Sequence, residues 1–208
     1  MNLQQLSSHT VDLDLLPESP TVLDVGCRDF GFTLAILEHR PKARVIAMDP
    51  DPEMSLERLP VEAIFLRRAL VGDIRQLSNY AGWSTGEGNI LCDVAPHYAE
   101  RTHWVMCVNL ENLMIEHYPE AKHFDLVKLD CEGTEYEILE HWPGPVATQI
   151  SVEFHDWTGP WKEYAASGYY ERLWAGPLHD YEVVQHELSP VGPGQHMGHW
   201  DSLLRLRK

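Results

Sequence analysis

A run of acidic residues follows a short apolar stretch in the second half of the chain. Residues 124–129 (FDLVKL) have the composition of a buried strand, and Asp130, Glu132 and Glu135 come directly after it around Gly133. A segment with helical periodicity follows. Ligands bind to open α/β sheets at the edge formed by the carboxyl ends of the strands. We therefore predict that Asp130 lies at the floor of an active site.

An acid and two glycines mark a second turn between a strand and a helix, near the N-terminus. The sequence DVGCRDFG places Asp24 near the end of an apolar strand, Gly26 in the turn and Gly31 at the start of a helix. Gly26 allows a tight backbone turn and the close approach of a ligand to the helix N-terminus. The spacing differs from the GxGxxG of dinucleotide-binding proteins, which holds a pyrophosphate. It suits a cofactor without phosphate, such as S-adenosylmethionine, and the alternative is a structural turn that merely needs a glycine.

A third acid follows the next predicted strand. Residues 44–48 form an apolar run that leads into Asp49 and Pro50. In a nucleoside-binding site, a carboxylate at this position accepts hydrogen bonds from the ribose hydroxyls. Combined with the turn at Gly26, the position favours a ribose-binding role for Asp49 over that of a simple turn residue.

A fourth group of polar residues lies at the end of another apolar run, residues 147–154. Glu153 and His155 alternate along this strand and should point to one side, beside Asp130. One interpretation makes His155 the base that takes a proton from a substrate hydroxyl, because an unperturbed imidazole titrates near working pH. A second is a divalent metal held by Asp130, Glu153, His155 or Asp156, which is possible but not favoured. A third is a histidine that only caps the strand end.

Composition and charge exclude several classes of protein. A chain of 208 residues suits one α/β domain, residues 1–208, with a helical or irregular N-terminal extension over residues 1–20. The formal net charge of -16 disfavours a nucleic-acid or membrane partner, and no apolar stretch has the length of a membrane span. The four cysteines show no paired spacing, and the N-terminus lacks the layout of a signal peptide. These features predict a cytoplasmic protein with reduced thiols.

Strand-like and helix-like patterns alternate along the chain. Strands are expected at residues 21–26, 44–48, 61–66, 124–129, 147–154, 181–186 and 202–206. Helices are expected at residues 1–16, 30–37, from Glu53 onward, at 109–117 and at 160–174. This alternation predicts a parallel sheet with right-handed crossovers.

Taken together, these motifs resemble a known family. The blocks DVGCRDFG, AMDPDPE, KLDCEGTEYEIL and ISVEFHDW occur in this order in a way that is similar to FkbM-like S-adenosylmethionine-dependent methyltransferases. The most specific block runs from Lys128 to Glu135 and is similar to the family's Lys-Ile-Asp-Val-Glu-Gly-x-Glu signature. The resemblance implies an α/β fold with a Rossmann-like class I methyltransferase sheet. That sheet has seven strands, mostly parallel with the last strand antiparallel, and helices on both faces.

The resemblance also implies roles for individual residues. In the family pattern Asp24, Gly26 and Gly31 form the cofactor turn, Asp49 holds the ribose, and Asp130 lines the pocket near the methyl group. The turn departs from the family, because Cys27-Arg28-Asp29 replaces a small Ala-Asn pair. The predicted cofactor-binding residues are Asp24, Gly26, Cys27, Arg28, Phe30, Gly31, Asp49, Pro50 and Asp130. The predicted catalytic residues are His155, Asp130 and Glu153, and no metal ligand is assigned.

The predicted function is transfer of a methyl group from S-adenosylmethionine to a hydroxyl oxygen of a small-molecule or glycan-like acceptor. Aromatic residues could stack on such an acceptor or form the core face of a helix: Trp157, Trp161, Tyr164, Tyr169 and Tyr170. Segment 190–201, rich in His and Trp, is interpreted as a substrate-side loop. Two alternatives stay open. One is a metal-dependent hydrolase that uses Asp130, Glu153, His155 and His199, and the other is a non-catalytic nucleoside-binding module of the same fold.

Overall fold

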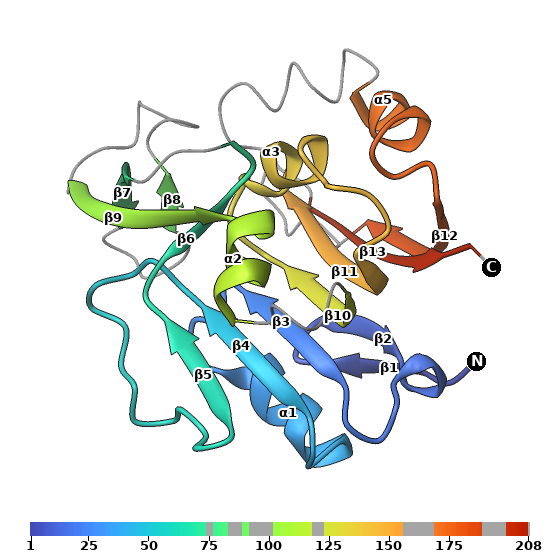
Figure 1. Ribbon diagram of the computed structural model, residues 1–208, viewed down its shortest axis with the longest axis horizontal. Coiled ribbons are helices and arrows are strands. Elements are labelled where there is room, and N and C mark those ends of the chain that lie inside the picture. Colours follow the sequence, from blue (N-terminus) through green and yellow to red (C-terminus); the bar gives the residue numbers. More distant parts are fainter. Residues whose placement is uncertain are drawn as a thin grey trace, which may run out of the picture.

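A mixed sheet of seven strands forms the centre of the computed structural model (Figure 1). The structure describes residues 1–73, 77–82, 89–91, 102–117, 123–155, 169–188 and 199–207. In spatial order the strands are β12 (Tyr181–Leu188), β13 (His199–Leu206), β11 (Ala147–His155), β10 (Phe124–Leu129), β3 (Thr21–Val25), β4 (Arg44–Met48) and β5 (Ala63–Leu66). Strands β11 to β5 are parallel, and the last strand, β13, is antiparallel to both of its neighbours. The predicted sheet is confirmed.

Helices cover both faces of this sheet, also as predicted. Because side chains alternate along a strand, Leu23 and Val22 of β3 face opposite sides. Leu23 belongs to a core cluster that includes side chains of α3 (Glu135–Glu140), whereas Val22 packs in a separate cluster with side chains of α1 (Gly31–His39). The C-terminal ends of β3 and β10 therefore lie between two well-packed layers.

The N-terminal segment differs from the helix expected over residues 1–16. Strands β1 (Leu3–Leu6) and β2 (His9–Asp12) form an antiparallel hairpin, followed by the short 3-10 helix η1 (Leu13–Leu15). All four residues of β2 are buried. The side chain of Gln149 on β11 accepts a hydrogen bond from the Asp12 N–H at 3.0 Å and donates one to the Asp12 carbonyl at 3.1 Å. These contacts with the sheet, which the local sequence pattern does not contain, hold the segment as a hairpin.

A second sheet lies at one edge of the first. Its order is β6 (Ala69–Val71), β9 (Thr102–Asn109), β7 (Leu77–Gly82) and β8 (Asn89–Leu91). Helix α2 (Leu110–His117) follows β9, and the Asn109 side chain caps it by accepting a hydrogen bond from the N–H of Asn112 at 3.0 Å. The helix expected from Glu53 is replaced by turns. Of the helix expected at 160–174, the described part is α5 (Tyr169–Ala175).

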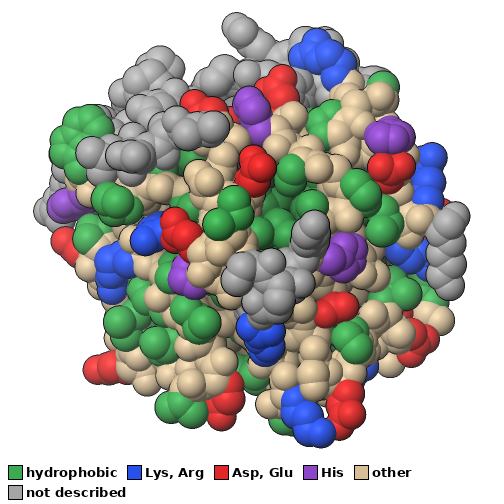
Figure 2. Space-filling model, in the orientation of Figure 1, with side chains coloured by type: hydrophobic (Ala, Val, Ile, Leu, Met, Phe, Trp, Pro, Cys, Tyr) green, Lys and Arg blue, Asp and Glu red, His purple; other side chains and the backbone are tan. Residues whose placement is uncertain are grey.

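Acidic and basic side chains are interspersed on the face of the molecule that Figure 2 shows. Within the part of the chain that the structure describes, no helix combines the length and the apolar character that crossing a bilayer requires.

Candidate active site

A cavity of about 410 Å³ lies at the C-terminal ends of β3 and β10. Its walls come from the hairpin turn (residues 7–9), the turn after β3 (residues 26–29), Phe32, Lys128 and Asp130. This volume falls within the range of small-molecule and cofactor sites. The sequence predicted two of these walls, the turn and Asp130, and missed the hairpin.

Gly26 allows the first turn to touch the end of β10. Its φ is +75°, and a Cβ built on it would lie 1.7 Å from the carbonyl oxygen of Asp130. Arg28 and Phe30 also have positive φ, 42° and 62°. Phe30 is fully buried against Phe65, with the ring centroids 5.6 Å apart, and lies outside the lining of the cavity. Phe30 was predicted to bind the cofactor, and its observed contacts are those of a core residue.

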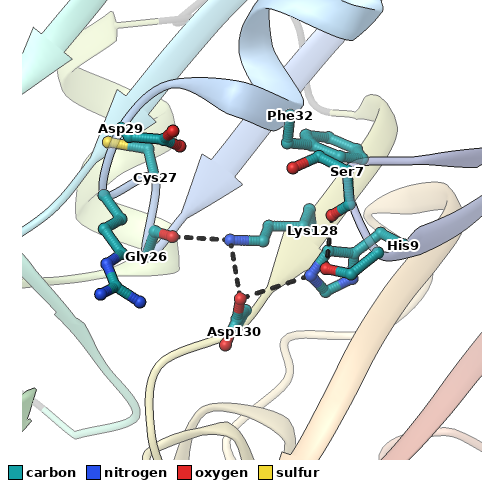
Figure 3. Close-up of a pocket in the computed structure, with 10 residues that line it drawn as sticks. Ser7, His9, Gly26, Cys27, Asp29, Phe32, Lys128 and Asp130 are labelled. Atoms are coloured by element: carbon teal, nitrogen blue, oxygen red, sulfur yellow. Dashed lines mark hydrogen bonds and ion pairs between the residues drawn. The ribbon is translucent and has the colours of Figure 1, made fainter. Parts of the chain in front are cut away.

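Lys128 connects the turn with Asp130 (Figure 3). Its Nζ donates to the carbonyl oxygens of Gly26 at 2.7 Å and Val25 at 3.1 Å, and it lies 3.4 Å from carboxylate oxygens of both Asp24 and Asp130. The side chain is buried. Burial alone would lower the pKa of Lys128, but Asp130 and Asp24 outweigh it and raise this pKa. Lys128 is therefore a permanent buried cation that fixes the turn.

Asp24 and Gly31, which were predicted to form the cofactor turn, lie on either side of the turn after β3 and contact the elements that pack against it. Asp24 is fully buried beside Lys128 on the neighbouring strand, and its carboxylate accepts a hydrogen bond from the hydroxyl of Thr33 at 2.6 Å. Gly31 begins α1, where a Cβ would lie 2.8 Å from the hydroxyl oxygen of Ser7. These two residues position helix α1 and the hairpin against the turn.

Asp49 lies at the end of β4, where the sequence placed it. One carboxylate oxygen accepts a hydrogen bond from the N–H of Arg28 at 3.0 Å, and the other accepts one from the N–H of Asp51 at 2.9 Å. Burial raises the pKa of Asp49. Pro50, which follows it, is half-buried. Asp49 thus ties the turn after β3 to the end of β4, and its contact with a ribose stays a prediction.

The three predicted catalytic residues come together around His155. Its Nε2 atom lies 3.5 Å from a carboxylate oxygen of Glu132, 3.7 Å from one of Glu153 and 3.9 Å from one of Asp130. Its Nδ1 atom lies 3.1 Å from Oε1 of Glu135. The structure therefore brings Asp130, Glu153 and His155 to one place, as the strand alternation predicted.

The charges of this group shift one another's pKa values. Burial alone would lower the pKa of His155, but Glu135, Glu132 and Asp130 raise it to about 10. Burial, followed by the charge of Asp130, raises the pKa of Glu153 to about 8. Burial likewise raises the pKa of Glu132 to about 6. In the absence of another cation, these carboxylates favour the protonated form of His155. A general base must be neutral, so its role as the base stays a prediction.

Asp130 keeps its negative charge. Burial would raise its pKa, but Lys128, a hydrogen bond from His9 and the charges of His9 and His155 lower it. Its side chain is 27% exposed, so it is both charged and accessible from the cavity. A fixed carboxylate at this point suits a cationic ligand.

Two residues beside Asp130 and His155 were not predicted from the sequence, His9 and Glu135. His9 Nε2 lies 3.4 Å from Oδ2 of Asp130, and its Nδ1 lies 3.4 Å from the hydroxyl oxygen of Ser151. His9 is separated from Asp130 by 121 residues, and only the packing of the hairpin on β11 brings it to the site. Glu135 is fully buried and accepts hydrogen bonds from the N–H groups of Cys131 and Gly133.

Several predicted residues lie outside the described part of the chain. These are Asp156, Trp157, Trp161, Tyr164 and residues 190–198. His199 is described by its backbone, which pairs with His155 in the β11–β13 ladder.

The strand order and the position of the cavity define a Rossmann-like methyltransferase fold. The family described as Methyltransferase FkbM domain matches residues 24–183. The chain therefore belongs to the FkbM methyltransferase family. A comparison with curated proteins gives no match.

Solved structures of low sequence identity share the fold. The fibrillarin pre-rRNA processing protein of Methanococcus jannaschii has a TM-score of 0.52 at 11% identity, over 95% of this chain and 70% of that chain. A proposed hemolysin from Streptococcus thermophilus has a TM-score of 0.52 at 14% identity, over 94% of this chain and 62% of that chain. Methyltransferase FkbM from Methylobacillus flagellatus KT has a TM-score of 0.50 at 12% identity, over 91% of this chain and 45% of that chain. The chain thus spans less than two thirds of the last two proteins, and the likeness concerns the fold alone.

Proposed function

We propose that the chain transfers the methyl group of S-adenosylmethionine to a hydroxyl oxygen of a small-molecule or glycan-like acceptor. Membership of the FkbM family supports methyl transfer. The observation that carries the proposal is the cavity, because one space joins the Gly26 turn with Asp130 at the carboxyl ends of adjacent strands. The oxygen acceptor rests on the resemblance of the sequence to FkbM-like enzymes.

The residues around the cavity fit such a cofactor. Gly26 lines the cavity, and its missing Cβ lets the turn pack directly on the carbonyl oxygen of Asp130 at the cavity wall. Asp49, at the end of β4, would accept hydrogen bonds from the ribose. The carboxylate of Asp130, kept ionised, would attract the positively charged sulfonium. When bound, the cofactor supplies an electrophilic methyl group on that sulfonium.

The chain's own residues would align the acceptor and handle its proton. Asp130, Glu153 and His155 meet beside the cavity, where an acceptor hydroxyl would lie. Holding the two reactants in line supplies most of the rate enhancement that such a transfer needs. When the methyl group leaves the sulfonium for the acceptor oxygen, these residues or water would take up the proton that the hydroxyl loses.

Charge and thiol chemistry support the class of partner and the compartment. The net charge of -16 and the interspersed charges in Figure 2 support an acceptor other than nucleic acid or membrane lipid. Among the described residues, Cys27, Cys107 and Cys131 are free thiols, which supports the proposal of a cytoplasmic protein.

Methyl-labelled S-adenosylmethionine, incubated with the purified protein and fractionated cell extract, tests the proposal. Mass spectrometry should find the label on an oxygen of a small molecule or glycan, and Glu153→Gln should reduce its incorporation. Label on nucleic acid would contradict the acceptor class. Cofactor binding without any labelled product would indicate the nucleoside-binding module. Elemental analysis for metal and a chelation-sensitive hydrolytic activity would instead indicate the hydrolase.

A further inference from the structure

The spacing of ligand atoms around His155 is that of a cation site. The Nε2 atom lies 3.5 Å from Glu132, 3.7 Å from Glu153 and 3.9 Å from Asp130, all at carboxylate oxygens. These distances exceed the usual length of a hydrogen bond. Two ligands of a tetrahedral ion with bonds of about 2.1 Å lie about 3.4 Å apart. Shifts of a few tenths of an ångström would therefore bring each carboxylate oxygen to the distance from Nε2 that two ligands of one cation have.

Glu135 orients the imidazole for this purpose. It is fully buried, is fixed by the N–H groups of Cys131 and Gly133, and lies 3.1 Å from Nδ1 of His155. Metal-binding histidines commonly donate their second N–H to a carboxylate in this way. In the neutral tautomer with hydrogen on Nδ1, the lone pair of Nε2 faces three carboxylates. A cation between them removes that repulsion.

A second group of ligand atoms shares Asp130. The ligand atoms of His9, Asp130 and Glu153 lie within 4.8 Å of one another, as do those of Asp130, Glu132 and His155. The side chains of Asp130 and Glu132 are 27% and 25% exposed, so an ion can enter from solvent. Two groups of ligand atoms, one with His9 and one with His155, thus meet at the partly exposed carboxylate of Asp130.

We propose that Asp130, Glu132 and His155 bind a divalent transition-metal cation, with Glu153 and His9 as further ligands. The mixture of imidazole nitrogen and carboxylate oxygen suits Mn²⁺ or Zn²⁺ better than Mg²⁺ or Ca²⁺, which prefer oxygen alone. The site adjoins the cavity at Asp130. This role rests on the proposed function: at that position the cation would bind the hydroxyl of the acceptor and lower the pKa of that hydroxyl.

Titration of the chelator-treated full-length protein with Mn²⁺ tests the site, by calorimetry and by loss of the free Mn²⁺ signal in electron paramagnetic resonance. One ion should bind per chain, and Zn²⁺ should compete for it. Glu132→Gln and Glu153→Gln should each weaken binding at least tenfold. Glu135→Gln should weaken it about 10- to 100-fold through the orientation of His155. Glu140→Gln, the same change at an exposed position of the same helix, should leave binding unchanged.

Absence of saturable Mn²⁺ and Zn²⁺ binding would overturn the proposal, because a proton on His155 would then hold the cluster together. Equal affinity in wild type, Glu132→Gln and Glu153→Gln would overturn it as well. S-adenosylmethionine binding, measured on the same samples, separates the two proposals. A chain that binds the cofactor but no ion contradicts only the metal site. A chain that binds the ion but no cofactor contradicts only the proposed function.

Discussion

Replacing Lys128 by methionine should destabilise the protein strongly. Methionine approximates the length of the side chain but removes the charge that lies 3.4 Å from Asp24 and from Asp130. It also removes hydrogen bonds to two backbone carbonyl groups at the cofactor turn. Breaking a buried ion pair from one side costs roughly 3–5 kcal/mol, because the remaining charge is left without compensation. In a protein of this size that loss lowers Tm by about 6–20 °C.

Urea denaturation followed by tryptophan fluorescence measures this loss, with Lys42→Met as the matched control. Lys42 pairs with Glu18 at 2.6 Å, but the two side chains are 66% and 80% exposed. The control should therefore change stability by no more than about 0.5 kcal/mol. Asp24→Asn combined with Lys128→Met should cost less than the sum of the two single changes. A Lys128→Met variant as stable as the control, or strict additivity in the double variant, would refute the reasoning.

Other variants test separate parts of the account. Gly26→Ala should lower the free energy of unfolding in urea by roughly 2–5 kcal/mol, because the added Cβ meets the backbone of Asp130. Gly144→Ala, where φ is +105° and the space around the Cβ is open, should lower it less. Equal losses in the two variants would contradict the contact between Gly26 and Asp130. Asn109→Ala should cost about 1 kcal/mol in the same assay by removing the cap of α2, and an unchanged midpoint would argue against that cap. Burial raises the pKa of Tyr181, so its protonated phenol stabilises the fold below about pH 10 and this stability is lost at higher pH. The Tm of the wild-type protein should therefore fall more steeply above about pH 10 than the Tm of Tyr181→Phe. Parallel curves of Tm against pH for the two proteins would contradict this role of Tyr181.

The strands of the central sheet could be predicted because each carries its own local signal, whereas the antiparallel last strand was implied by the family resemblance. The run Phe124–Leu129 is mainly apolar and is buried in the sheet centre, and Ala147–His155 alternates as a strand should. The hairpin could not be predicted in this way. The leucines of residues 1–16 fit a helical period, and the hydrogen bonds that decide the structure come from Gln149, far along the chain.

The residues of the site also divide into those that a local pattern predicts and those that only tertiary packing brings into place. Asp130, Glu153 and His155 each end a recognisable strand, so topology alone brings them together. His9 lies in a segment whose position depends on tertiary packing, and no local pattern marks it. The protonation state of His155 was also beyond the sequence. It depends on Glu132 and Glu135 approaching the ring from the turn after β10, which only the three-dimensional arrangement shows.

Calorimetric titration of S-adenosylmethionine into the purified protein tests the central claim most directly. The cavity between the Gly26 turn and Asp130 predicts one cofactor molecule per chain. Gly26→Ala should weaken this binding at least tenfold under conditions where circular dichroism shows the variant folded, and Gly144→Ala should bind as wild type does. Absence of binding to the wild-type protein, or undiminished binding to folded Gly26→Ala, would contradict the account.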